Sequence, residues 1–106
     1  MAGRLKRGEV RLVSFPTPNK QRPAVILTQD SAIGYLNALT VAPITSAIRG
    51  VPSQVVLGEE DGRKAPCAVN LHNLATVPKA RLGRRVATLS EERLREVCDA
   101  LGCGPS

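Results

Sequence analysis

The chain has 106 residues, enough for one domain with a packed core, and 42% of them are hydrophobic. One Tyr, one Phe and no Trp exclude an aromatic-lined peptide groove, and no apolar run approaches the ~20 residues that cross a bilayer. The net charge of +6 is uneven, with +5 in residues 1–58 and +1 in residues 59–106, which is typical either of a protein that binds a polyanion or of a basic but inert surface.

Short strand patterns separated by Pro and Gly fill the first three quarters of the chain. Three prolines predict a loop after the first strand, and Asp61-Gly62 is a strong signal for a hairpin turn. Strands this short and evenly spaced favour a small, strongly curved barrel or sandwich. The strands are expected at Glu9–Phe15, Ala24–Thr28, Asn37–Pro43, Ser53–Leu57, Cys67–Leu71 and Leu74–Pro78.

The last quarter of the chain carries a helical pattern. Ser90 can cap a helix whose positive N-terminus suits Glu91 and Glu92, and Gly102 can end it. An apolar stripe at helical spacing runs through Leu94, Val97, Cys98 and Leu101. We expect residues 1–106 to form a single domain with its core at about 7–101 and without fixed structure in the first seven and last four residues.

The three cysteines, Cys67, Cys98 and Cys103, bear on the compartment. Their odd number, and the lack of an apolar signal segment in MAGRLKRGEV, favour reduced thiols in the cytoplasm. A metal shared by Cys98 and Cys103 is the alternative, but a single histidine gives a poor ligand set. We therefore expect neither a metal site nor a cofactor.

Two segments combine an apolar strand with polar groups at one end. The first is QRPAVIL, which begins with Gln21 and Arg22, and the second is TVAPITS, which finishes with Thr45 and Ser46. If the two strands pair antiparallel, these ends meet, and a guanidinium and two hydroxyls converge at one rim. Neither segment contains a carboxylate that would neutralise Arg22.

The order of the motifs along the chain resembles the MazF/PemK toxins of type II toxin–antitoxin systems. The resemblance covers RGEV, QRPAVIL, TVAPITS, NLHNLATVPKARLG and the terminal helix, and the joint occurrence of RPAVIL and VAPITS is its specific part. It implies a mainly β fold, an SH3-like small barrel of the CcdB/PemK type with a C-terminal helix. It also implies a homodimeric endoribonuclease that cuts single-stranded RNA at short sequences without a metal ion.

Matched residue by residue, the resemblance implies that Arg22 of the RP motif and Thr45 of PITS are catalytic. The candidate substrate-binding residues are Thr17, Asn19, Lys20, Gln21, Ser46 and His72. The sequence departs from the family at two points. The loop that closes over RNA in relatives is short here, which bears on sequence preference, and His72 stands where relatives commonly carry an acidic residue.

RNA cleavage without a metal needs the residue types that the motifs supply. The 2′-hydroxyl attacks the phosphorus, and an arginine fork stabilises the negative charge of the transition state while a threonine hydroxyl adds a donor. Arginine is a poor general base, so His72, the only histidine, is a minor candidate for proton transfer. Structural alternatives are a paired cation at Arg22, turn caps at Thr45 and Ser46, and an ordinary surface or interface histidine at His72.

Two other classes of function share the implied fold. A gyrase-directed toxin of the CcdB type depends on a Trp near the end of its helix, and this chain has no Trp. A non-catalytic SH3-like module that binds RNA or protein would need an aromatic groove, which one Tyr and one Phe do not form. Besides single-stranded RNA, the resemblance implies two protein partners, a second copy of the chain and an acidic cognate antitoxin, and no membrane.

Overall fold

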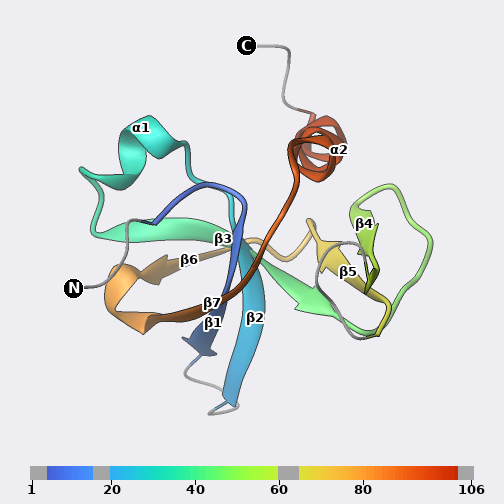
Figure 1. Ribbon diagram of the computed structural model, residues 1–106, viewed down its shortest axis with the longest axis horizontal. Helices are drawn as coiled ribbons and strands as arrows, with labels where there is room; N and C mark the ends of the chain where they lie inside the picture. Colours follow the sequence, from blue (N-terminus) through green and yellow to red (C-terminus); the bar gives the residue numbers. More distant parts are fainter. Residues whose placement is uncertain (1–4, 16–19, 60–64, 103–106) are drawn as a thin grey trace.

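A computed structural model describes residues 5–15, 20–59 and 65–102 of the chain. These residues form a seven-stranded antiparallel sheet with a helix packed across it (Figure 1). The strands are β1 (Glu9–Phe15), β2 (Lys20–Ile26), β3 (Ala38–Thr45), β4 (Gln54–Leu57), β5 (Cys67–Asn70), β6 (Ala75–Pro78) and β7 (Leu82–Thr88). The helices are α1 (Asp30–Ile33), the 3-10 turn η2 (Lys79–Arg81) and α2 (Glu91–Leu101).

Strand β3 joins the two halves of the sheet, because its two ends pair with different strands. Its first half pairs with β6, and Ile44 and Thr45 pair with β5, while β2 lies along its other edge. The path of neighbours is β4-β5-β3-β2-β1-β7. Within the described ranges β4 and β7 do not pair with each other, so the sheet is not closed. The predicted mainly β fold with a C-terminal helix is confirmed, in the form of an open barrel.

Two apolar clusters lie on opposite faces of the central strands. The first lies under α2 and includes Val25 and Ala42, and the second includes Ala24 and Val41. Successive residues of β2 and β3 therefore enter different clusters, as expected for strands buried on both faces. This confirms the interpretation of the continuous apolar run AVIL as a doubly buried strand.

The strand boundaries differ from the predicted ones in ways that affect the site. β2 begins at Lys20, so Arg22 is a strand residue and not part of a loop, and β3 continues to Thr45. The sequence reasoning missed β7, whose two adjacent arginines obscure any alternation, and the four-residue helix α1. The predicted Asp61-Gly62 turn lies outside the described residues.

The C-terminal helix has the predicted bounds and caps. The Ser90 side chain accepts a hydrogen bond from the Arg93 backbone N–H at 3.2 Å, and Gly102 takes the left-handed conformation at φ 77°. Val97 is fully buried in the first cluster. Gly8 suits its place because its φ of 91° is one that L side chains rarely adopt, and a Cβ there would also lie 2.8 Å from the Leu94 Cδ1 of the helix. No helix in the described part of the chain is long and apolar enough to cross a membrane.

Candidate functional site

The candidate site lies where the β2–β3 ladder ends. The last pair is Ala24 with Pro43, and the next residue of β2 is Pro23, which has no N–H to donate. The two strands then diverge (Figure 1). The same register, if continued by two residues, would set Arg22 opposite Thr45, but Ala24–Pro43 is the last pair that forms. The antiparallel pairing on which the sequence argument depended is therefore present, and the two prolines explain why it stops short of these residues.

Both residues belong to the face of the sheet that carries the second apolar cluster. Residues two apart in a strand share a face, so Arg22 follows Ala24, and Thr45 follows Val41 by way of Pro43. Ala24 and Val41 are fully buried, whereas Arg22 is exposed and Thr45 is half-buried. The face thus runs from a closed core to an open rim, and the two polar side chains stand at that rim.

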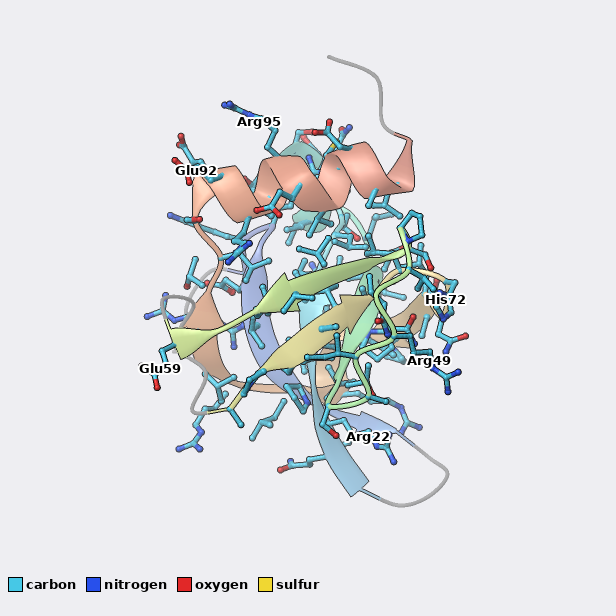
Figure 2. The ribbon with its side chains drawn as sticks, turned by 90° about the vertical axis from the view of Figure 1, so that its right-hand side faces the viewer. Arg22, Arg49, Glu59, His72, Glu92 and Arg95 are labelled. Carbon is cyan, nitrogen blue, oxygen red and sulfur yellow. The ribbon has the colours of Figure 1, made fainter. Side chains whose placement is uncertain are left out.

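The guanidinium of Arg22 has no partner within the described part of the chain. No hydrogen bond or ion pair joins it to another described residue, and the ion pairs present are those of Glu9 with Arg11 and Arg85 and of Arg93 with Glu96. Figure 2 shows Arg22 below β5. Glu59, just past the C-terminal end of β4, is well separated from it. An exposed, uncompensated cation at a strand end is suited to bind an anion.

The hydroxyl of Thr45 is held by the loop that follows it. Its Oγ1 accepts a hydrogen bond from the backbone N–H of Ala47 at 3.1 Å. Because this contact uses an oxygen lone pair, the hydroxyl hydrogen remains able to donate to a ligand. The turn role considered for Thr45 is therefore real, and it leaves the donor function intact.

Gln54, at the start of β4, braces the same loop. Its Oε1 accepts from the Arg49 backbone N–H at 2.8 Å, and its Nε2 donates to the Ala47 carbonyl at 3.1 Å. One side-chain amide thus bridges two backbone groups of the segment that fixes Thr45. The sequence did not indicate Gln54 as a site residue. Its contacts with the loop between β3 and β4 arise from the way the chain folds back and not from a local motif.

The remaining site candidates are dispersed. Gln21 is exposed and pairs with Ser14 in β1, and Ser46 is exposed in the turn after β3. Lys20 begins β2, while Asn19 and Thr17 lie outside the described residues. Gln21 adjoins Arg22 in β2, so its side chain lies on the opposite face of the sheet, and Ser46 adjoins Thr45 in the chain. Each lies next to a rim residue in the sequence, and the structure shows no contact that joins them.

His72 lies apart from this rim. It follows β5, is exposed, and its Nδ1 forms a hydrogen bond with the Ser53 hydroxyl. In Figure 2 it stands near Arg49 at one end of the β4–β5 pair, away from Arg22. This arrangement suits a surface histidine more than a group acting on the same phosphate as Arg22.

The chemistry available at the rim is that of a cation and hydroxyl donors. Among the described residues no group of three or more His, Cys, Asp or Glu side chains could hold a metal ion. Cys67 and Cys98 are free thiols, and Cys103 lies outside the described ranges. Such a donor set can bind a phosphodiester and stabilise added negative charge on its oxygens.

Comparison with known proteins identifies the class. The family described as PemK-like, MazF-like toxin of type II toxin-antitoxin system matches residues 6–102. The chain belongs to this family.

Individual relatives agree with this assignment. The chain is 34% identical over 98 residues to the probable endoribonuclease MazF2 of Mycobacterium tuberculosis, covering 92% of this chain and 94% of that protein. The Mycobacterium tuberculosis toxin MazF-mt6 matches with a TM-score of 0.80 and 30% identity over 89% of this chain and 92% of that one. An endoribonuclease in complex with its cognate antitoxin, from a mycobacterial species, shares the fold with a TM-score of 0.84 at 20% identity, covering 93% and 92%.

Proposed function

We propose that this chain is an endoribonuclease toxin that cleaves single-stranded RNA, including mRNA, without a metal ion and so blocks translation. The family is one of toxins, and a relative that is 34% identical bears the name of an endoribonuclease. The neighbouring 2′-hydroxyl attacks the phosphorus, leaving a 2′,3′-cyclic phosphate and a free 5′-hydroxyl. The observation that carries the proposal is the exposed guanidinium of Arg22, without an acidic partner among the described residues, on the strand whose pairing with β3 ends two residues before Thr45.

Arg22 acts by stabilising charge. Attack by the 2′-hydroxyl turns phosphorus five-coordinate, and its non-bridging oxygens gain negative charge. A guanidinium binds two such oxygens through parallel N–H donors, and it stays charged throughout. Because no described carboxylate competes for these donors, they remain free for the substrate.

Thr45 supplies a further donor to the same oxygens, and solvent balances the protons. The bond that forms joins O2′ to phosphorus, and the bond that breaks joins phosphorus to O5′. O2′ loses a proton and O5′ gains one. At an exposed rim, water can accept the first proton and supply the second, so the step does not need His72. DNA lacks the 2′-hydroxyl and is not cleaved by this route.

RNA binding rests on residues around this centre. Gln21 and Ser46 are exposed at the two strand ends, and both suit hydrogen bonds to the sugar-phosphate backbone. Thr17, Asn19 and Lys20, which precede Gln21 in the sequence, are further proposed RNA-binding residues. With few aromatic side chains in the chain, base stacking contributes little, so affinity depends on phosphate contacts and on salt.

The proposed partners follow from the family. The chain acts as a homodimer in the cytoplasm, and an acidic cognate antitoxin neutralises it by covering the RNA-binding rim. The charge of +5 in residues 1–58 suits an acidic partner electrostatically. An endoribonuclease of the same fold is known in complex with its cognate antitoxin, which supports the pairing.

The direct test compares the parent protein with Arg22→Ala on single-stranded RNA in excess chelator. We expect the parent to give cyclic-phosphate ends and the variant to be slower by about a hundredfold or more, because one well-placed donor is worth that much. A matched single-stranded DNA should stay intact. Equal rates for the two proteins would remove Arg22 from the mechanism. Loss of activity in the presence of chelator would mean that a metal ion is required, which contradicts the proposed mechanism.

A further inference from the structure

The face that carries Thr45 continues onto the two strands beyond β3. Thr45 pairs with Ala68 of β5, and Ala68 pairs with Val56 of β4. Two residues further along, Asn70 of β5 pairs with Gln54 of β4. Directly opposite residues, and residues two apart in one strand, share a face of the sheet.

The opposite face of these strands is the first apolar cluster. Val55 of β4 and Val69 of β5 belong to that cluster, and they alternate with Gln54 and Asn70. The two amide side chains therefore lie on the Thr45 face. Asn70 is the diagonal neighbour of Thr45 across the β3–β5 pair, a relation that corresponds to about 7–8 Å between backbone positions.

The two amides of this row differ in how their hydrogen-bonding groups are used. Both ends of the Gln54 amide are bonded to the backbone of the loop after Thr45. The Asn70 amide bonds to no other described residue, and its Oδ1 is buried without any partner. A buried hydrogen-bond acceptor without a partner destabilises a folded protein and is uncommon, so its presence at Asn70 needs a physical reason.

We propose that Asn70 reads the edge of the nucleobase next to the phosphate held by Arg22 and Thr45. This inference rests on the function proposed above and names the part of the site that selects the sequence. A side-chain amide carries a donor and an acceptor side by side, which matches the paired donor and acceptor on a base edge. In single-stranded RNA these edges are free to be read.

The position of Asn70 fits this role. Asn70 lies inward from Thr45 along the same face. A nucleotide can span the distance between these two residues, with its phosphate at the rim and its base at Asn70. The two paired amides would then have different roles. Gln54 positions the loop that holds Thr45, and Asn70 binds the ligand. The Oδ1 is buried, so a base reaches it once the amide turns toward the ligand, and a donor on the base edge then makes the hydrogen bond that no described residue supplies.

A purely structural role predicts a different response to substitution. If Asn70 served the fold, removing its amide would lower the melting temperature. If it serves the substrate, Asn70→Ala removes a buried acceptor that has no partner, and the melting temperature stays the same or rises. The same variant should then lose sequence preference, which a structural asparagine would not affect.

The experiment uses the full chain and a pool of single-stranded RNAs with randomised sequence. Cleavage products are sequenced for the parent, Asn70→Ala and Asn70→Asp, and kcat/KM is measured on the best RNA and on its single-base variants. We expect Asn70→Ala to lose about tenfold or more of the discrimination at one position beside the cut, the worth of one paired amide–base contact. Asn70→Asp, which has only acceptors, should shift that position toward bases that present donors.

Asn73→Ala is the matched control, since it is an exposed asparagine three residues away in the turn after β5. It should leave the preference unchanged. An unchanged profile for both Asn70 variants, or an equal loss of rate on every RNA, overturns the inference while the proposed function stands. A parent protein that cleaves no RNA overturns the proposed function and this inference with it. Thermal melting of each variant separates loss of fold from loss of selectivity.

Discussion

Arg11 and Arg22 lie on neighbouring strands and on the same face of one sheet, yet their surroundings are opposite. Arg11 is 13% exposed, contacts Glu9 at 2.9 Å and donates to the Gly83 carbonyl. Arg22 is exposed, and its guanidinium makes no hydrogen bond or ion pair with another described residue. The guanidinium of Arg11 links β1 to β7, whereas that of Arg22 contacts no described residue.

The difference shows that the surroundings of an arginine, and not the residue type alone, determine its role. Glu9 is buried, so its carboxylate needs cations and donors close by, and Arg11 meets that need. No acidic residue occupies a comparable place beside Arg22 in the described ranges. We expect substitutions at Arg11 to act on stability and those at the rim to act on catalysis, and the following predictions test that division.

The largest effect on stability is expected for Arg11→Ala. It leaves the buried Glu9 carboxylate with Arg85 at 3.7 Å and the Lys6 backbone N–H at 3.3 Å, and should lower the free energy of unfolding by about 3 kcal/mol. Urea denaturation measures the change, and kcat/KM of the folded fraction should not move. Arg22→Ala is the control and should stay within about 0.5 kcal/mol of the parent. Equal losses for both variants would erase the distinction between the two arginines.

Thr45→Val should act chiefly on catalysis, although it also removes the hydrogen bond from the exposed Ala47 N–H. Valine keeps the shape of threonine but removes the hydroxyl, so a hydrogen bond to a charged phosphate is lost, at a cost of about tenfold to a hundredfold in kcat/KM. Thr45→Ser retains the hydroxyl and should recover most of the rate. Single-turnover cleavage of one RNA measures all three proteins. If Thr45→Val cleaves as fast as the parent, the hydroxyl only caps the turn to Ala47.

Salt dependence separates the two arginines more finely. A cation that contacts a phosphate of single-stranded RNA contributes about 0.7 to the slope of log affinity against log salt concentration. Arg22→Ala should reduce the slope by about that amount, whereas Arg11→Ala should leave it unchanged. Fluorescence anisotropy with an uncleavable RNA that carries 2′-deoxy sugars gives the slopes. Identical slopes for the parent and Arg22→Ala would mean that this cation does not reach the phosphate.

His72→Gln should have the smallest effect, about twofold or less in kcat/KM, as for other exposed positions away from a site. The imidazole bonds to Ser53 and stands apart from Arg22, so its loss removes no contact at the rim. The pH profile of cleavage should keep its shape in this variant. A large fall in rate together with a changed profile would instead identify His72 as the proton acceptor.

Much of the fold was predictable because local chemistry determined it. The run AVIL is a doubly buried strand, and Ser90 and Gly102 bound the C-terminal helix, since each signal acts within a few residues. Strand β7 was not predictable in this way. Its exposed arginines give no apolar alternation, and it is a strand because β1 offers backbone groups to pair with.

The sequence by itself determined the family, the residues proposed to be catalytic and the elements that carry them, because the motifs around Arg22 and Thr45 are continuous stretches of chain. Only the tertiary structure decided which charges remain free and which amides lie beside the rim. Those properties depend on pairing between strands far apart in the sequence. Gln54 and Asn70 meet the Thr45 face through the β3–β5–β4 register, and no local pattern encodes that contact.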